Sequence, residues 1–254
     1  MAAKFQLACF ERLGVAGAQV LIELLRYATE AGLLVIIDGK RGDIDISAAA
    51  YGQALFAGFQ TPFGWVDGMH ADAATVNPYI GRDGLVPLRE AARAASGGLF
   101  VLVRTSNRDA GQLQDLCTVE SSGTTRAGLA APPAGSRARA VWERVAEIVA
   151  ELGAGCLGGS GLSDVGAVLG ATVPAHLRRA RELMPASIFL MPGIGAQGGR
   201  IEDLAPAFEP GRAGGLITAS RSIAEAHRHA GGEPGDAARS EAERLRTIAW
   251  SLAD

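Results

Sequence analysis

The sequence predicts an α/β protein built on a parallel sheet, and a (β/α)8 TIM barrel fits its length. Short apolar runs alternate with longer stretches of helical period, as in successive βα units. The short runs are apolar throughout, which is typical of parallel strands covered on both faces. The chain has 254 residues, 48% of them hydrophobic, and α/β barrels run to about 250 residues as one domain. We therefore expect residues 1–254 to form a single domain.

Six apolar runs are the expected strands, and each is followed by polar or glycine residues. A shorter run at residues 1–4 is a further strand or the stub of one. The six runs are residues 33–37, 71–76, 99–103, 165–169, 188–191 and 216–218. Six strands and a stub fall short of the eight strands in a complete barrel.

Stretches of helical period separate these strands. We expect helices at residues 16–29, 47–59, 86–95, 140–152, 175–184 and 237–252. The least regular segment is 107–139, which is rich in Ser, Thr, Pro and Gly. It is expected to be a long loop, and loops of that length are usually functional or mobile.

Charge and composition exclude several classes of partner. The net charge of −3 gives no basic field for nucleic acid or an anionic membrane surface. No apolar run is long enough to span a bilayer, and the first residues lack the plan of a signal peptide, so we expect a cytoplasmic protein. Cys9, Cys117 and Cys156 are far apart, and the four histidines are scattered, so neither a disulfide framework nor a metal site is expected. Small-molecule chemistry is left as the default.

A charged run, D-G-K-R-G-D, follows directly on the expected strand 33–37. Asp38 and Lys40 are two residues apart, so they should point to one face near the carboxyl end of that strand, where barrel enzymes place their active sites. Asp43 can fold back toward Lys40 or reach a neighbouring subunit. Two carboxylates beside one ammonium would keep it protonated. A simple salt bridge at the strand end is the alternative interpretation.

A glycine-rich segment, residues 190–199, lies between a strand and a short helix. Three of its glycines match the spacing G-x-G-x-x-G, and such glycines let backbone N–H groups approach an anion. The position late in the chain favours the phosphate site of a barrel over a dinucleotide site. Arg221 would supply a charged contact and Gln197 a neutral one. A tight turn with a solvated arginine is the alternative.

Two more strand ends carry polar residues. Ser106 follows the strand 99–103, and its hydroxyl and N–H could contact the edge of a heterocycle, although a loop or capping serine is an equal alternative. The strand 71–76 is followed by N-P-Y, where Pro78 fixes the turn and a structural role is expected first.

Together these motifs resemble the orotidine 5′-phosphate decarboxylase family, in the bacterial subgroup whose signature reads D-x-K-R-G-D-I. The similarity extends over nearly the whole length and is weakest in residues 107–161. Six segments carry it in the family's order: residues 4–11, 38–47, 77–79, 105–107, 192–199 and 220–221.

The resemblance implies a homodimeric carboxy-lyase without metal or organic cofactor, which converts orotidine 5′-monophosphate to UMP in de novo pyrimidine synthesis. Lys4, Asp38 and Lys40 would form the charged array of one active site, and Asp43 would complete it from the partner subunit. Lys40 would stabilise the carbanion left at C6 by loss of CO2 and then donate the proton.

The resemblance also assigns substrate contacts. Ser106 would contact the pyrimidine, Gln197 and Arg221 would hold the phosphate, and Ile44 and Ser47 would reach across the dimer, Ser47 in place of the family's usual threonine. The substrate-binding set implied in this way is Ile44, Ser47, Ser106, Pro192, Gln197, Gly198, Ser220 and Arg221.

Two alternatives share the same motifs. Sister enzymes with a D-x-K-x-x-D run act on sugar phosphates with Mg²⁺, but their second strand ends in an acidic metal ligand where this chain has Lys4, which would repel the metal. A non-catalytic barrel that binds a phosphorylated ligand is the second alternative.

The start of the chain departs from the family's pattern. In the family, the first strand ends in an aspartate that binds the ribose hydroxyls, but here only three residues precede Lys4. We therefore expect a barrel without strand 1, helix 1 and most of strand 2. An internal methionine taken as the start explains this better than an inactive relic, because the other motifs are intact. Open edges should leave the 254-residue chain with weak or no turnover.

Overall fold

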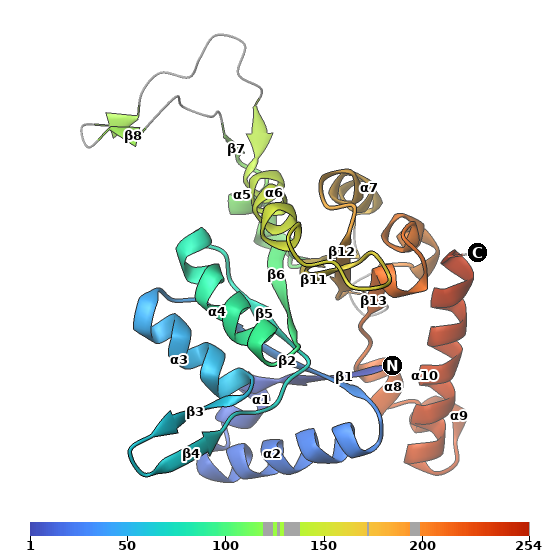
Figure 1. Ribbon diagram of the computed structural model, residues 1–254. Helices are drawn as coiled ribbons and strands as arrows, with labels where there is room; N and C mark the ends of the chain where they lie inside the picture. Colours follow the sequence, from blue (N-terminus) through green and yellow to red (C-terminus); the bar gives the residue numbers. More distant parts are fainter. Residues whose placement is uncertain (119–123, 126–127, 130–137, 172, 194–198, 254) are drawn as a thin grey trace.

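A parallel sheet of seven strands forms the centre of the molecule (Figure 1). The computed structural model describes residues 1–118, 124–125, 128–129, 138–171, 173–193 and 199–253. Within them the strands follow one another along the sheet in the order β1-β2-β5-β6-β11-β12-β13. Their bounds are β1 Ala2–Gln6, β2 Leu34–Arg41, β5 Ala73–Val76, β6 Gly98–Arg104, β11 Ser163–Leu169, β12 Ser187–Met191 and β13 Gly215–Ile217. The prediction of an α/β fold with a parallel sheet is confirmed.

Helices cover the outer face of this curled sheet (Figure 1). A sheet whose strand order follows the chain order has all its right-handed crossovers on one side. Six longer helices correspond to the six predicted ones: α2 Gly14–Glu30, α3 Asp45–Leu55, α4 Arg82–Ala94, α6 Val141–Gly153, α7 Pro174–Leu183 and α10 Pro234–Trp250. None of the helices in the described part of the chain is long and apolar enough to cross a membrane.

Shorter elements connect these units. The short helices are α1 Leu7–Glu11, η1 Arg108–Ala110, α5 Gly111–Gln114, η2 Ile201–Phe208, η3 Arg212–Gly214, α8 Arg221–Ala224, α9 His227–Ala230 and η4 Ser251–Ala253. In the described part of the chain, three antiparallel pairs lie outside the main sheet: β3 Gly58–Thr61 with β4 Gly64–Asp67, β7 Cys117–Thr118 with β10 Arg139–Ala140, and β8 Thr124–Thr125 with β9 Gly128–Leu129. The irregular segment predicted at 107–139 therefore holds η1, α5 and several short strands among its described residues.

The two faces of the sheet carry different parts of the core. On β2, Val35 and Ile37 point outward into the large cluster beneath the helices. Ile36 points inward, because side chains alternate along a strand. The inner face forms a smaller cluster made of Ile36, Phe100, Val168 and Leu190. The inner face is thus apolar below the carboxyl ends of the strands.

Two predicted elements differ from the structure. The stub expected at residues 1–4 is a strand of five residues, Ala2–Gln6, which pairs with β2 from Ala2 opposite Leu34 to Gln6 opposite Asp38. The helix expected at 47–59 ends at Leu55. Gly58, with a φ of 100°, turns the chain there into the β3–β4 hairpin. Continuous apolar residues had concealed that boundary, since a left-handed φ ends a helix whatever the side-chain pattern.

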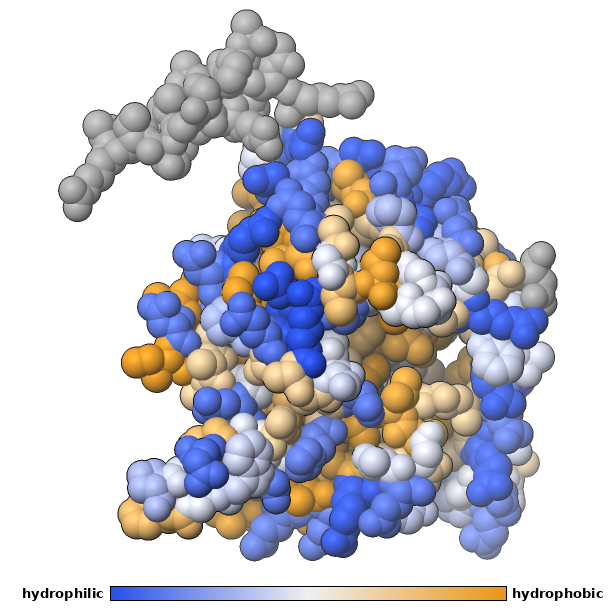
Figure 2. Space-filling view, in the orientation of Figure 1, coloured by the Kyte–Doolittle hydropathy of each residue, from blue (hydrophilic) through white to orange (hydrophobic). Residues whose placement is uncertain are grey.

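The strands at the two ends of the sheet, β1 and β13, do not pair with each other in the described structure. A cavity of about 490 Å³ lies between them, and α10 closes its outer side. Figure 2 shows this face hollowed beside α10, with apolar side chains inside. Lys4 of β1 and Arg221 of α8 both line this cavity.

Candidate active site

Asp38 is the centre of a charged group at the carboxyl end of β2. Its side chain is only 10% exposed. Lys4 Nζ lies 2.5 Å from Asp38 Oδ2, and Lys40 Nζ lies 2.6 Å from Asp38 Oδ1. The structure therefore brings together three of the four predicted catalytic residues. We call Lys4, Asp38 and Lys40 the charged array.

Two neutral side chains complete the shell of Asp38. Thr75 Oγ1 donates a hydrogen bond of 2.8 Å to Asp38 Oδ1 and accepts one of 3.0 Å from the backbone N–H of Lys40. The Gln6 amide, in the orientation that satisfies both of its ends, donates to Asp38 Oδ2 at 2.7 Å. Neither Thr75 nor Gln6 was predicted from the sequence to contact Asp38. The signal was their place, since each lies at or near the carboxyl end of a strand beside β2.

A bulge in β2 sets the direction of the Lys40 side chain. In the pairing of β2 with β5, Ile37 lies opposite Ala74 and Arg41 opposite Val76, so three residues of β2 face one of β5. Lys40 has a φ of 48°, a left-handed conformation that costs a non-glycine residue about 1–3 kcal/mol and that clusters at functional sites. The prediction that Asp38 and Lys40 share a face is confirmed by their contact, and both residues lie within the bulge.

The surroundings of Asp38 keep it ionised. Burial by itself raises the pKa of Asp38, but the hydrogen bonds from Lys4 and Lys40 and their positive charges outweigh burial and hold the pKa below its ordinary value of 3.8. A carboxylate is therefore fixed between two ammonium groups at neutral pH. The Lys40 side chain is 44% exposed, so it can contact a ligand as well as Asp38.

Asp43 and its neighbours lie on the surface segment between β2 and α3. Asp43 is half-buried, and its Oδ1 accepts a hydrogen bond of 2.8 Å from the backbone N–H of Ile44. Among the described residues it forms no ion pair with Lys40, so it does not fold back onto the array. Ile44 and Ser47 are both exposed.

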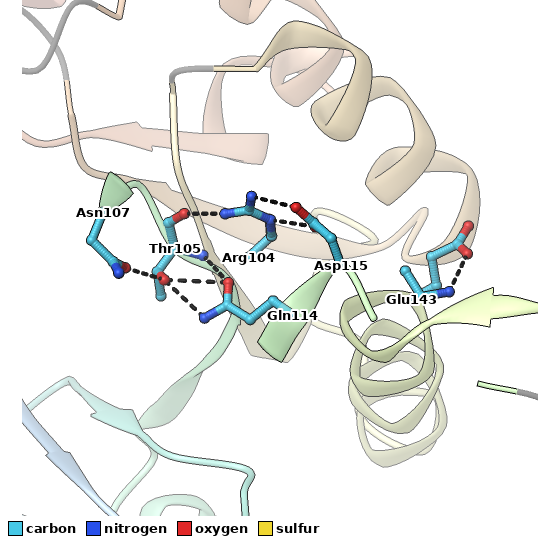
Figure 3. A network of polar contacts seen from close by, with 7 residues as sticks. Arg104, Thr105, Asn107, Gln114, Asp115 and Glu143 are labelled. Atoms are coloured by element: carbon cyan, nitrogen blue, oxygen red, sulfur yellow. Dashed lines mark hydrogen bonds and ion pairs between the residues drawn. The ribbon is translucent and has the colours of Figure 1, made fainter. Parts of the chain in front are cut away.

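Ser106 lies in the turn that follows β6, and a polar network holds the residues around it (Figure 3). Arg104 makes a two-pronged ion pair with Asp115, with both bonds at 2.8 Å. Gln114 bonds to the backbone and the hydroxyl of Thr105. The hydrogen bonds from Arg104 lower the pKa of Asp115 and keep the pair charged. Ser106 itself is half-buried.

The expected phosphate residues are described in part. Pro192 follows β12 and is half-buried, whereas Gln197 and Gly198 lie outside the described residues. Ser220 and Arg221 follow β13, are exposed, and line the cavity together with Lys4. Arg212 and Arg246 also line it, and no aspartate or glutamate does so in the described part of the chain. The cavity is therefore cationic as well as apolar.

Comparison with known proteins identifies the family. Its sequence profile, described as the orotidine 5′-phosphate decarboxylase / HUMPS family, matches residues 1–231. The chain belongs to this family.

Individual members of the orotidine 5′-phosphate decarboxylase / HUMPS family give the same result. The orotidine 5′-phosphate decarboxylase of Rhodopirellula baltica is 42% identical over 228 residues, which are 89% of this chain and 68% of that protein. The structure of Leishmania donovani OMP decarboxylase is 31% identical with a TM-score of 0.67, covering 98% of this chain and 81% of that one. Leishmania donovani UMP synthase is 33% identical with a TM-score of 0.68, and this chain spans 46% of its length.

Metal ligation was the feature expected to separate two branches of this family. No group of three or more His, Cys, Asp or Glu side chains in the described residues is placed to hold a metal ion. Lys4 occupies the array beside Asp38 at 2.5 Å. An ammonium at that distance competes directly with a cation for the carboxylate.

Proposed function

We propose that this protein is a cytoplasmic enzyme of pyrimidine synthesis that decarboxylates orotidine 5′-monophosphate to UMP. The observation that carries the proposal is the charged array: a buried carboxylate held between Lys4 and Lys40 at the carboxyl end of a parallel strand. Family membership and the names of the relatives support it. No metal or organic cofactor takes part in the proposed reaction.

The array fits the chemistry of this reaction. The bond between C6 and the carboxylate carbon breaks, CO2 leaves, and the electron pair stays on C6, where resonance gives little relief. A fixed positive charge near C6 stabilises that pair as it develops. Lys40 supplies the charge and then transfers one proton from Nζ to C6, giving UMP. Asp38, with Lys4 and Thr75 bonded to it, holds Lys40 in place before the reaction, so little reorganisation is needed.

The remaining predicted residues would bind the substrate. Ser106 would contact the pyrimidine ring, and Arg221 would pair with the phosphate, assisted by Ser220. Gln197 would also hold that phosphate, and Pro192 and Gly198 would belong to the same substrate-binding set. The cationic lining of the cavity supports an anionic substrate of this kind, because four cationic residues face it and none of its described lining residues is acidic.

We propose that the enzyme is a homodimer in which Asp43 of each chain completes the other chain's array, with Ile44 and Ser47 beside it. Three features support this arrangement. Asp43 makes no ion pair within its own chain among the described residues. Ile46 is 87% exposed and Tyr79 is 81% exposed. The turn at Asn77 packs against Gly42, so both apolar side chains belong to one surface around Asp43.

We also propose that residues 1–254 form one domain, and that its sheet is that of an eight-stranded barrel opened between β1 and β13. The continuous strand order and the cavity between the two end strands support this description. An opened barrel exposes the strand edges of β1 and β13.

One experiment tests both the reaction and the dimer. Decarboxylation of orotidine 5′-monophosphate is followed without added metal for the wild-type chain, Lys40→Ala, Asp43→Asn and a mixture of the two variants. Each variant alone should lose about 10³-fold or more in kcat, because each removes part of the proton donor's site. Lys40→Ala should still bind UMP. In the mixture, shared sites would restore up to about a quarter of the wild-type activity, since mixed dimers contain one intact site.

Three outcomes would contradict parts of the proposal. Turnover of a hexulose phosphate that depends on Mg²⁺ would assign the chain to the sugar-phosphate branch of the family. Binding of UMP without any turnover would leave a phosphate-ligand-binding barrel. If the wild type decarboxylates the substrate but the mixture recovers no activity, the proposed reaction stands and the proposed sharing of Asp43 between subunits is wrong.

A further inference from the structure

We propose that Gln114 and the Arg104–Asp115 ion pair are positioning residues that fix the turn carrying Ser106 and so set the affinity of the site for a pyrimidine ring. This inference rests on the proposed function, because it takes Ser106 as the residue that contacts the ring. Neither Gln114 nor Asp115 needs to contact the ligand. Their role is read from the bonds they make to the residues on either side of Ser106 (Figure 3).

Gln114, the last residue of the short helix α5, bonds to Thr105 in two ways. Its Oε1 accepts a hydrogen bond of 2.8 Å from the Thr105 backbone N–H, and its Nε2 donates one of 2.9 Å to Thr105 Oγ1. The same hydroxyl donates at 2.6 Å to Oδ1 of Asn107. One glutamine therefore fixes the residue before Ser106 and, through Thr105, the residue after it.

The ion pair holds the turn from a third point. Arg104 is the last residue of β6, and its side chain is largely buried. Its Nε and Nη2 bond to the two carboxylate oxygens of Asp115, while Nη1 donates at 2.7 Å to the carbonyl of Thr105. A two-pronged pair of this kind fixes the plane of the guanidinium. The carbonyl that precedes Ser106 therefore has a donor in a defined place.

Gly170, just after β11, confines the turn on the opposite side. Its backbone N–H donates at 2.7 Å to the carbonyl of Arg104. A Cβ atom at this position would lie 2.8 Å from Ser106 Cα and 2.9 Å from Ser106 N, closer than real Cβ contacts allow, so a glycine is required for this approach. Ser106 thus sits between a backbone wall at Gly170 and the polar network of Gln114 and Arg104.

A turn held from both sides binds a planar ring with little loss of freedom. Ordering a mobile polar turn on binding costs conformational entropy, and a preformed turn avoids that cost. The proposed contacts to the phosphate come from Ser220 and Arg221, which follow β13 and are not part of this turn. Loosening the turn should therefore weaken binding of the base and leave binding of the sugar phosphate unchanged.

The test compares two ligands by isothermal titration calorimetry on the full chain: UMP, and ribose 5-phosphate, which lacks the base. Gln114→Ala should lower the affinity for UMP about tenfold and leave that for ribose 5-phosphate within about twofold, since it removes two hydrogen bonds from the turn. Gln114→Glu keeps the acceptor for the Thr105 N–H and should recover part of the loss. Gln112→Ala, an exposed position two residues earlier on the same helix, is the matched control and should change neither affinity.

If Gln114→Ala folds poorly, Thr105→Val is the second variant, because it replaces only the hydroxyl with a methyl group. It should lower the affinity for UMP about threefold and leave the affinity for ribose 5-phosphate unchanged. Equal losses for both ligands, or an unchanged preference for UMP in Gln114→Ala, would overturn the positioning role. A wild-type chain that binds ribose 5-phosphate as tightly as UMP would instead remove the proposed function, and this inference with it. The wild-type preference thus separates the two failures.

Discussion

Two buried charged side chains in this molecule, Asp38 and Arg181, are stabilised by different kinds of partner. Asp38 is 7% exposed and lies between two lysines at the carboxyl end of the sheet. Arg181 of α7 is 5% exposed, and no carboxylate of the described residues pairs with it. Its guanidinium stacks on Phe189 at 3.8 Å and donates to six backbone carbonyls: those of Met184, Pro185, Ser187, Pro206, Ala207 and Gly214.

The difference in partners indicates that Asp38 has a chemical role and Arg181 a structural one. Carbonyl groups are fixed by the backbone, so the Arg181 guanidinium joins α7, β12, η2 and η3 and has no free donor direction toward a ligand. Burial lowers the pKa of Arg181 to about 10, and it remains protonated at neutral pH. The charged partners of Asp38 are the ammonium groups of two flexible lysine side chains, and Lys40 remains half-exposed. Of the two, only the arrangement around Asp38 can exchange its partners during a reaction.

Replacing Arg181 should have the largest effect on stability. Arg181→Met removes the guanidinium that donates to these six carbonyls, most of them in buried bonds, and we expect it to lower the free energy of unfolding by about 3–5 kcal/mol. The free energy of unfolding of Arg181→Lys should lie between those of the wild type and Arg181→Met. An ammonium group cannot reach all six carbonyls or stack on Phe189 as a guanidinium does. Urea unfolding followed by circular dichroism measures the loss. Arg178→Met, an exposed position on the same helix, should change stability by less than about 0.5 kcal/mol. Equal losses of unfolding free energy for Arg181→Met and Arg178→Met would contradict the structural role of Arg181.

The Asp38 charge should contribute less, and its contribution should depend on pH. The pKa of folded Asp38 lies below its ordinary value of 3.8, so the stability it adds is present above that value and is lost as the pH falls through the folded pKa. At pH 7, Asp38→Asn should cost about 1–3 kcal/mol. The gap between wild type and variant should close as the pH falls from about 5 to about 2. Arg181 titrates near 10 and adds no slope in that range, so a gap that stays constant in acid would contradict this description.

Thr75 should have the smallest effect. Thr75→Val keeps the shape of the side chain but removes the donor to Asp38 and the acceptor for the Lys40 N–H. We expect a loss of about 1 kcal/mol in urea unfolding and a rise in the pKa of Asp38, measured by NMR titration of the carboxyl carbon. An unchanged Asp38 titration would show that the two lysines alone hold its charge.

Much of this fold could be predicted because buried parallel strands are continuous apolar runs, which need no knowledge of their neighbours. Asp38 and Lys40 were predicted for the same reason, since charges directly after such a run are unusual. The bulge in β2 could not be predicted, because it depends on the register with β5. Gln6 and Thr75 likewise became visible as partners only once the order of strands was known.

The burial of Arg181 was not predicted, although its position on the helix indicates it. Leu177, Ala180 and Arg181 occupy one stripe of α7 at helical spacing, and all three are buried. An arginine within an apolar stripe predicts a buried cation that needs acceptors. Its neighbours Arg178 and Arg179 lie off that stripe. Three of its acceptors, the carbonyls of Pro206, Ala207 and Gly214 in η2 and η3, are set by the tertiary structure.

The strand order has a consequence for how the site is assembled during synthesis. Each strand of the main sheet pairs with the one made just before it, so pairing can proceed in the order in which the ribosome delivers the chain. Lys4, Asp38, Lys40 and Thr75 are all present once the first 76 residues, through the end of β5, have emerged. Arg221 emerges more than half a chain later. The part of the site that would carry the chemistry can thus form long before the part that would hold the phosphate.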